Sequence, residues 1–457
     1  MNITVINGSP KGKYSITYQN IRYLEKHFPE LNFQVFHIGE KIKTMERDLS
    51  AFSAVMDSVA GCDCVIWCYP VFTFLAPYQL VRFIELIFLR KRNIDFSGKY
   101  TVQMLTSRHF YDHTAINYLQ AVCEDLEMKH LPGFSSDMED LTTKRGRENL
   151  LTFGKTLARS IENQIPVSRK FDLVHPKPGK YSPVNVPSAE HQAGKHKIVL
   201  ITDNTDHESN LGKMIETFIK LVPFHVDIVN LAEFPFRGGC LECLHCTIEG
   251  RCIYSDEFDV YHENHIQSAD CVIYAAEIHR HWLSSTWKCF YDRQFYNGHR
   301  SSMMGKSVGY IISGPLRYES NLREILEARS EVEHLYLLDI VTDEYDSDTE
   351  ITALLKNLAE SAMWAVQTKP QRPLTFLGVG GMKVFRDLIF TMRGLMSEDH
   401  RFFKKHRLYD FPQKQKGTIF KGYVIGFLMK SKRLRKKAAG ILKQGILEQY
   451  QSIIDKY

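Results

Sequence analysis

The chain has 457 residues, 44% of them hydrophobic, which predicts two or three domains with well-filled cores. No run approaches the ~18 consecutive apolar residues of a membrane-spanning helix, which excludes an integral helical membrane protein. Residues 1–7 are typical of a strand rather than a signal peptide, so the expected compartment is the cytoplasm. The net charge of +5 is uneven, because residues 371–457 hold 19 Lys and Arg against 6 Asp and Glu, which leaves −8 for the first 370 residues.

A glycine-containing turn follows the first expected strand, Asn2–Asn7. The sequence continues as Gly8-Ser9-Pro10-Lys11-Gly12 and on to Thr17, and a helix is then expected to run towards His27. A strand, a glycine turn and a helix N-terminus in succession suit a phosphate, because backbone N–H groups and the helix dipole favour an anion. The side chains that would assist are Ser9, Lys11, Ser15 and Thr17. The pattern leaves a solvated capping turn open as an alternative.

Strands alternate with helices over the rest of the first module, residues 1–163. They are expected at Asn32–His37, 63–68, Tyr100–Thr106 and 128–131. The aromatic-rich loop YPVFTFLAP at 69–77 suits the wall of a flat ring, with a core or interface role for Phe72 and Phe74 as the alternative. The βα alternation predicts a doubly wound parallel α/β sheet with ligand loops at the carboxyl ends of its strands.

Residues 164–195 contain five prolines and favour extended chain, so they are expected to link two domains. A loop packed on one domain is the alternative.

The same βα plan returns in the second module, residues 196–370. Its strands are expected at Ile198–Thr202, 226–231, 269–276, Ser307–Ser313 and 335–341, and a helix at 351–366 closes it.

Four cysteines lie within thirteen residues of the second module: Cys240, Cys243, Cys246 and Cys252. Thiolates this close can wrap one small soft-metal centre with little loop-closure entropy. Structural zinc sites usually separate two cysteine pairs by a long insert, whereas a compact run favours an iron–sulfur cluster. A [4Fe–4S] cluster, zinc, and unligated thiols or a disulfide all remain open from the spacing.

The first module resembles the flavodoxin-like NADPH-dependent FMN reductases. The resemblance rests on Gly8-Ser9-Pro10-Lys11 with Ser15 and Thr17, and on Tyr69-Pro70-Val71-Phe72. It implies that the first loop holds the FMN phosphate through Ser9, Lys11, Ser15 and Thr17. It also implies that the second loop and the loop after the fourth strand border the isoalloxazine ring: Tyr69, Pro70, Val71, Phe72, Thr106 and Ser107. The fourth-strand loop departs from the family because it lacks the usual run of glycines.

The second module resembles the iron–sulfur flavoproteins, which are relatives of these reductases. The match is the C-x2-C-x2-C-x5-C run, which implies that Cys240, Cys243, Cys246 and Cys252 ligate a [4Fe–4S] cluster near the flavin. The whole resemblance implies two tandem flavodoxin-like sheets, each with strand order 2-1-3-4-5, followed by a basic helical C-terminal extension.

The second module departs from the family in its phosphate loop. Residues 202–210 read TDNTDHESN, with Asp203, Asp206 and Glu208 where a phosphate would lie. Like charges disfavour that binding, so no FMN is assigned to this module. His279 and His281 are expected to be exposed loop residues, with a metal or proton-transfer role as the alternative.

Residues 371–457 form the basic C-terminal region. Apolar residues at helical spacing predict an amphipathic helix over 382–396, and the glycines of residues 378–381 are expected to form a turn before it. The runs FFKKHR at 402–407 and KSKRLRKK at 430–437 are basic. Helices packed on the modules, contact with an anionic membrane surface and an acidic partner are the alternatives, and no nucleic-acid partner is expected.

Together these features predict an NAD(P)H-dependent flavin oxidoreductase that passes electrons between FMN and a [4Fe–4S] cluster. NAD(P)H and an unidentified electron acceptor would be its partners, and the two modules are expected to pair within the chain. No side chain needs to act as an acid or base, so no catalytic residue is assigned outside the cofactor shell. The alternatives are an electron carrier that serves a ferredoxin-like partner, and a degenerate tandem protein without a cluster.

Overall fold

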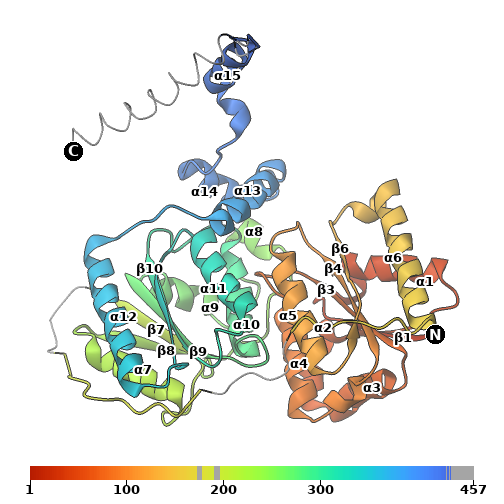
Figure 1. Ribbon diagram of the computed structural model, residues 1–457, viewed down its shortest axis with the longest axis horizontal. Helices are drawn as coiled ribbons and strands as arrows, with labels where there is room; N and C mark the ends of the chain where they lie inside the picture. Colours follow the sequence, from red (N-terminus) through yellow and green to blue (C-terminus); the bar gives the residue numbers. More distant parts are fainter. Residues whose placement is uncertain (172–177, 190–195, 429, 432, 434–457) are drawn as a thin grey trace. The chain divides into compact units, whose positions relative to one another are not determined.

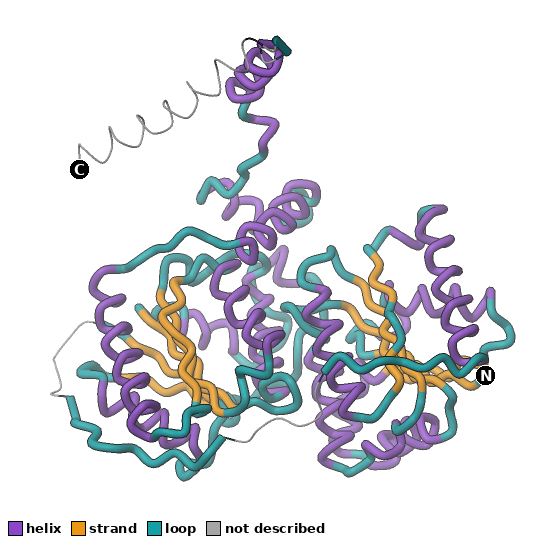
Figure 2. The backbone as a smooth tube through the Cα atoms, viewed as in Figure 1, coloured by secondary structure: helices purple, strands orange, loops and turns teal. Residues whose placement is uncertain are grey.

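A computed structural model describes residues 1–171, 178–189, 196–428, 430, 431 and 433 (Figure 1). The chain divides into two compact units, Met1–His400 and Arg401–Tyr457. The first unit contains two α/β modules, each with a central parallel sheet between layers of helices (Figure 2). Along the described part of the chain, no helix is long and apolar enough to cross a membrane.

The sheet of the first module has the order β2-β1-β3-β4-β5, with the short β6 paired to β4. Its strands are β1 Asn2–Asn7, β2 Asn32–His37, β3 Cys64–Pro70, β4 Tyr100–Thr106, β5 Lys129–His130 and β6 Phe134–Ser136. Its helices are α1 Ile16–His27, α2 Ile38–Arg47, α3 Leu49–Ala60, α4 Tyr78–Leu89, α5 Asp112–Asp125 and α6 Lys144–Glu162. Residues on one face of β3 pack with α1 and α6, and those on the other face pack with α3, α4 and α5. Helices on both faces explain why this central strand is apolar along its length.

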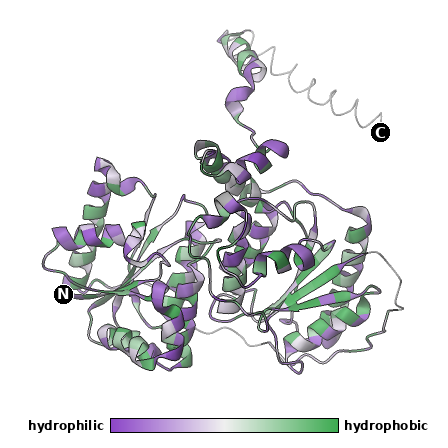
Figure 3. Ribbon diagram, turned by 180° about the vertical axis from the view of Figure 1, so that it is seen from behind, coloured by the Kyte–Doolittle hydropathy of each residue, from purple (hydrophilic) through white to green (hydrophobic). Residues whose placement is uncertain are grey.

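The sheet of the second module has the order β11-β10-β9-β7-β8, which is the same order read from the other edge. Its strands are β7 Ile198–Thr202, β8 Val226–Asn230, β9 Cys271–Glu277, β10 Ser307–Ser313 and β11 Tyr336–Thr342. Its helices are α7 Asn210–Leu221, α8 His245–Glu249, α9 Phe258–Tyr261, α10 Ser285–Arg293, α11 Ser320–Val332 and α12 Asp348–Thr368. The predicted fold class, two tandem doubly wound sheets of order 2-1-3-4-5, is confirmed. Figure 3 shows the apolar strands of this sheet between helices with polar outer faces.

Short one-turn helices complete both units: η1 Gly12–Tyr14, η2 Asn93–Phe96, η3 Asp140–Thr142, η4 His262–Ile266, η5 Gln294–Asn297 and η6 Pro412–Lys414.

The described part of the proline-rich segment packs on the second module. Tyr181 is fully buried there, and its hydroxyl lies 2.9 Å from Thr352 Oγ1.

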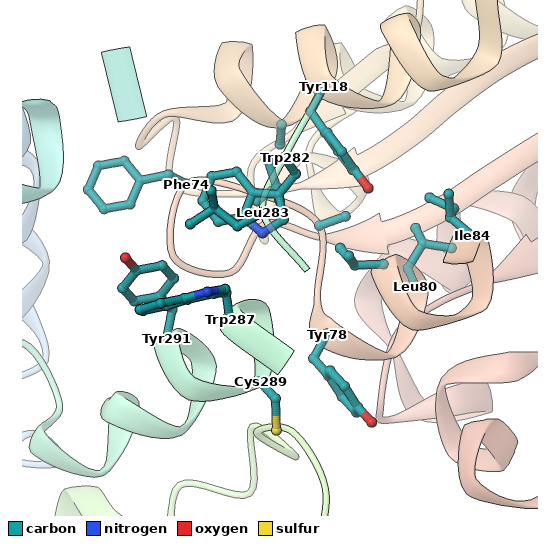
Figure 4. Packing of buried hydrophobic residues seen from close by; sticks show 14 of the residues in the cluster. Phe74, Tyr78, Leu80, Ile84, Tyr118, Trp282, Leu283, Trp287, Cys289 and Tyr291 are labelled. Atoms are coloured by element: carbon teal, nitrogen blue, oxygen red, sulfur yellow. The ribbon is translucent and has the colours of Figure 1, made fainter. Parts of the chain in front are cut away.

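The two modules face each other across helices of the same kind. Helix α4 packs against α10, and α5 packs against α11. Side chains from both modules form one continuous core at this contact, with Leu80 and Phe74 on one side and Trp282, Trp287 and Tyr291 on the other (Figure 4). Helix α10 follows β9 as α4 follows β3, so the contact has the form of a two-fold dimer interface inside one chain.

The glycines of residues 378–381 lie inside helix α13 (Phe376–Thr391), so the expected turn is wrong. A Cβ on Gly378 would lie 2.9 Å from Glu331 Cβ, and one on Gly381 would lie 2.7 Å from Val332 Cγ2. These glycines therefore let α13 approach α11 closely. The Glu331 carboxylate accepts from the N–H groups of Thr375 and Gly378 and thereby caps α13.

The chain continues as α14 Ser397–Lys405, and the second unit contains α15 Lys416–Leu428. Lys430, Ser431 and Arg433 are the described members of the basic run 430–437, and the remaining five lie outside the described residues.

Candidate functional site

The loop after β1 is shaped by its own side chains. The Asn7 amide donates to the Gly12 carbonyl at 3.0 Å, and its oxygen accepts from the Ser9 N–H at 3.0 Å. Gly12 has φ +49°, which favours glycine, and Gly39 lies so close that a Cβ there would be 2.2 Å from the Ser9 carbonyl oxygen. The predicted phosphate loop of the first module, residues 8–17, is therefore a tight turn that leads directly into α1.

The hydroxyl groups predicted to bind phosphate are buried at this turn: Ser9, Ser15 and Thr17. Thr17 Oγ1 lies 2.7 Å from Thr106 Oγ1, which joins the start of α1 to the end of β4. Ser15 is the N-cap residue of α1, yet within the described residues its side chain accepts no capping hydrogen bond from the helix. The donors of the first turn are thus left for another acceptor, which fits an anionic group such as the FMN phosphate.

The corresponding loop of the second module is closed. Ser209 Oγ accepts from the Gly212 N–H at 3.0 Å and caps α7. The residue after β7 is Asp203, whose partly buried carboxylate accepts from Trp287 Nε1 at 2.8 Å and from the Ser284 hydroxyl. Burial raises the pKa of Asp203. Among the described residues, the start of α7 therefore lacks the uncapped arrangement that is found at the start of α1.

The positions of Asp203 and Trp287 hold smaller residues in the first module. Gly8 follows β1 as Asp203 follows β7, and Leu80 is the third residue of α4 as Trp287 is the third residue of α10. A Cβ on Gly8 would lie 2.7 Å from Leu80 Cβ, so the first loop needs glycine there. At the equivalent positions, the second module has a carboxylate that is hydrogen-bonded to an indole.

The loop predicted to border the flavin ring divides its side chains between core and surface. Tyr69 is buried and donates its hydroxyl hydrogen to Gln103 Oε1, whereas Pro70 and Val71 are partly exposed. Phe72 is buried, and its ring lies 5.8 Å from that of Phe295 in the second module. Tyr69 and Phe72 thus anchor the loop, and Pro70 and Val71 present its surface.

The end of β4 supplies the last two predicted ring contacts. Thr106 and Ser107 are both buried. The Ser107 N–H donates to the Ser136 carbonyl at 3.0 Å, and its hydroxyl oxygen accepts from the His109 N–H at 2.9 Å. The pairing of β4 with β6 that positions this loop was absent from the sequence-based expectations.

The four-cysteine loop, residues 238–254, contains four cysteines that form no disulfide. Cys243 is exposed, Cys240, Cys246 and Cys252 are partly buried, and all four are free. Burial and the neighbouring Cys243 and Cys252 raise the pKa of Cys246 to about 11. The donor set is that of a soft metal centre. Over the described residues, however, no three His, Cys, Asp or Glu side chains are gathered around a common point.

This loop lies against the first module beside the phosphate loop. Lys11 Nζ is 3.2 Å from Glu242 Oε2, and Gln79 Nε2 donates to the Cys240 carbonyl at 3.1 Å. Gly239 packs on Tyr78 so closely that a Cβ would lie 2.6 Å from the ring. Sequence reasoning missed Gln79, Tyr78 and Glu242 as members of the site, because no local pattern signals a contact between residues in different modules.

Arg293 secures the loop from the second module's side. Its guanidinium donates to the Gly238 carbonyl at 3.2 Å and to both Asp256 carboxylate oxygens at 2.6 Å. Burial acts to raise the pKa of Asp256, but the hydrogen bonds from Arg293 and the Arg237 N–H outweigh it and lower that pKa. The segment that contains the first two cysteines is therefore held between the two modules.

His281 is buried, so the expectation that it is an exposed loop residue is wrong. Its Nδ1 lies 2.8 Å from Glu319 Oε1, and its Nε2 lies 3.4 Å from Asp125 Oδ2 at the end of α5. The two carboxylates outweigh burial and raise the pKa of His281 to about 9. Arg280 also pairs with Asp125, at 3.6 Å. His279 is exposed, as expected.

Two doubly wound parallel sheets of order 2-1-3-4-5 define a flavodoxin-like α/β protein. The model of the family described as NADPH-dependent FMN reductase matches residues 1–139 and 196–332. The chain therefore belongs to the NADPH-dependent FMN reductase family.

Comparison with curated proteins finds an iron-sulfur flavoprotein of Archaeoglobus fulgidus, 27% identical over 119 residues. The matched region is 25% of this chain and 53% of that protein, so the chain spans about half the length of the curated relative it matches.

Among solved structures, an NADH:FMN oxidoreductase (EMOB) in its apo form is 15% identical, with a TM-score of 0.31, and the match covers 36% of this chain and 91% of that chain. The flavoenzyme FerB of Paracoccus denitrificans is 17% identical with a TM-score of 0.30, and the match covers 35% and 97%.

Proposed function

We propose that the protein is an NAD(P)H-dependent flavin oxidoreductase with one FMN in the first module and a [4Fe–4S] cluster on the four-cysteine loop. Ser9, Lys11, Ser15 and Thr17 would hold the phosphate, and Pro70, Val71, Thr106 and Ser107 would border the ring. Cys240, Cys243, Cys246 and Cys252 would hold the cluster. Bound FMN supplies the chemistry that converts hydride transfer from NAD(P)H into single-electron steps.

The observation that carries the proposal is the contact between the two loops. Lys11 in the phosphate loop pairs with Glu242, which lies between Cys240 and Cys243 in sequence. The segment that contains Cys240 and Cys243 thereby lies beside the turn that precedes α1, at the interface between the modules. The family match to both modules and the curated relative named for iron–sulfur and flavin support the same assignment.

The chain's own residues would position the flavin rather than move protons. Uncapped N–H groups at the start of α1 would bind the phosphate, and Lys11 would add positive charge. The anchored side chains of Tyr69 and Phe72 would fix the loop that Pro70 and Val71 present to the ring. Asp203 and the capped start of α7 support a single FMN per chain, because the equivalent place in the second module is filled.

The decisive experiment is a visible spectrum of anaerobically purified protein, with FMN, iron and acid-labile sulfide counted per chain. One FMN with four iron and four sulfide is the expected result. Steady-state oxidation of NADH and NADPH with added acceptors then tests the activity. Colourless protein without FMN or iron would contradict the proposal and leave a tandem protein with degenerate sites.

An electron carrier that serves a ferredoxin-like protein is the second candidate, supported by the position of the cysteine loop at the surface of the interface, where Cys243 is exposed. The two functions separate in one assay. A carrier would show no turnover of NAD(P)H with added acceptors while a reduced ferredoxin still reduces its flavin. The domain boundaries proposed for these roles are 1–163 for the FMN module and 196–370 for the cysteine module, in a cytoplasmic protein.

A further inference from the structure

The second unit carries an apolar helix that the described structure leaves uncovered. Helix α15 has no buried residue, and its aromatic side chains are among the most exposed of the chain: Phe420 69%, Tyr423 77% and Phe427 73%. Ile419, Val424, Ile425 and Leu428 are exposed as well. A contiguous apolar surface of this kind marks a place where a protein meets a partner or a membrane.

The distribution of these residues around α15 favours lipid over a protein groove. At about 100° per residue, the seven large apolar side chains span about 240° of the helix circumference. Thr418, Gly422 and Gly426 occupy most of the remaining arc. A groove on a protein covers one stripe of a helix, whereas the headgroup–acyl boundary of a bilayer can contact the underside and both flanks of a helix that lies in its plane.

Charge around the helix identifies which lipid surface would suit it. Residues 401–437 contain thirteen Lys and Arg and a single carboxylate, Asp410. Lys416, Lys421 and Lys430 are exposed within or beside α15. The first 370 residues carry −8, so an anionic surface would attract this segment and repel the rest of the chain.

The length of α15 fixes how it could lie. Thirteen residues span about 20 Å as a helix, less than the ~30 Å hydrocarbon core of a bilayer. Aromatic side chains interleaved with lysines suit the boundary between headgroups and acyl chains. We propose that α15 and its neighbouring lysines dock the protein peripherally on an anionic membrane surface, with the helix in the plane of the interface.

Co-sedimentation of the full-length protein with vesicles tests this proposal. Phosphatidylglycerol-containing vesicles should bind the protein, pure phosphatidylcholine vesicles should bind it far more weakly, and salt should reduce the difference. Phe420→Ser, Tyr423→Ser and Phe427→Ser together should weaken binding by at least about a hundredfold. Each of Lys416→Gln, Lys421→Gln and Lys430→Gln should weaken it about fivefold.

A matched control lies on the first module. Leu89 and Ile94 are also exposed apolar residues, at 68% and 69%, so Leu89→Ser with Ile94→Ser should leave vesicle binding unchanged. Equal binding by the α15 variant and this control would overturn the proposal. The assay is independent of the redox assignment, because it applies equally to protein that contains neither FMN nor iron.

Tryptophan fluorescence supplies a second readout that depends on the position of α15. Trp67, Trp282 and Trp287 are buried, and Trp364 is half exposed, so Phe427→Trp in a Trp364→Phe background gives one indole that can respond to lipid. Its emission should shift to the blue, and brominated lipid should quench it, with anionic vesicles alone. A blue-shifted indole before lipid is added would overturn the proposal in favour of folding back on the chain. Self-association that Gly422→Leu abolishes would overturn it in favour of helix pairing.

Discussion

The backbone N–H of Tyr78 donates a hydrogen bond to Asp292 Oδ2 at 2.7 Å, so a carboxylate of the second module caps the start of α4 in the first. The contact is reciprocal, because Glu85 in α4 accepts from the N–H and the hydroxyl of Ser285, the first residue of α10. Each helix therefore caps its counterpart. This exchange is the mark of an isologous interface, here formed by two unequal halves of one chain.

Replacing Asp292 with alanine should destabilise the paired modules strongly. Asp292 is fully buried, and it also binds the ammonium of buried Lys288 and accepts from Thr73 Oγ1 at 2.7 Å. The substitution leaves a buried cation without its partner, which typically costs about 3–5 kcal/mol of unfolding free energy in urea titrations. Asp57→Ala removes an exposed ion pair with Arg92 and should cost less than about 1 kcal/mol. Equal losses for the two variants would contradict this role of Asp292.

Stability should fall at alkaline pH because of His281. The folded-state pKa of about 9 lies above the unfolded value near 6.5, so its contribution is complete below pH 6.5 and disappears as pH rises through about 9. The difference, on the order of 3 kcal/mol, should be seen as a steeper loss of unfolding free energy between these pH values. His281→Gln should flatten that slope. His109→Gln, at a half-exposed histidine beside Asp112, should leave it unchanged.

The phosphate loop can be tested against its closed equivalent. Ser9→Ala, Ser15→Ala and Thr17→Ala together remove the buried hydroxyls beside the uncapped start of α1, and FMN affinity should fall at least about a hundredfold. Ser209→Ala in the second module removes a helix cap and should cost about 1 kcal/mol of stability without altering FMN content. Stoichiometric FMN in the triple variant, measured by flavin fluorescence after heat release, would refute the assignment of this loop.

The cysteine assignment is tested by Cys243→Ser. Loss of one of four thiolates should remove most of the iron and sulfide after anaerobic reconstitution, whereas FMN should remain. Cys62→Ser is the matched control, because Cys62 is a buried free thiol outside the loop whose donor bond to the Val59 carbonyl a hydroxyl can replace. Equal iron contents in the two variants would exclude Cys243 as a ligand.

Glu242 should tune FMN binding through Lys11. Their ion pair is partly exposed, so its expected contribution is below about 1 kcal/mol. Glu242→Gln should free the ammonium and remove a negative charge beside the phosphate loop, which tightens FMN binding about two- to fivefold at low salt. Glu249→Gln changes an exposed carboxylate of the same loop and serves as the control. Weaker binding after Glu242→Gln would show that Glu242 orients Lys11 productively instead.

The features predicted correctly from the sequence are those that depend on residues close together in the chain. Continuous apolar runs marked the central strands, and the order of both sheets followed from βα alternation and family resemblance. Strand β6 was missed because three residues carry too little pattern. The glycines of α13 were assigned to a turn because the reason for them, close packing on α11, lies in another segment. His281 was misjudged because Asp125 is 156 residues away in the sequence.

In the candidate site, too, local motifs were visible in the sequence and contacts between distant segments were not. The turn after β1 and the cysteine run were both evident as local motifs. Their adjacency was not, because the Lys11–Glu242 contact depends on how the modules pair. For the second module, the sequence predicted only that its carboxylates disfavour a phosphate, because the hydrogen bond between Asp203 and Trp287 joins segments that are distant in the sequence.

Covalent fusion changes what the α4–α10 contact can do. In a homodimer, one gene encodes both subunits, so a residue that fills a site in one subunit fills the same site in the other. Here a hydrogen-bonded Asp203 stands where the first module has Gly8, so the two halves differ at equivalent positions, and the covalent link keeps them together at any dilution. The tandem arrangement thus permits a division of labour that identical subunits could never encode.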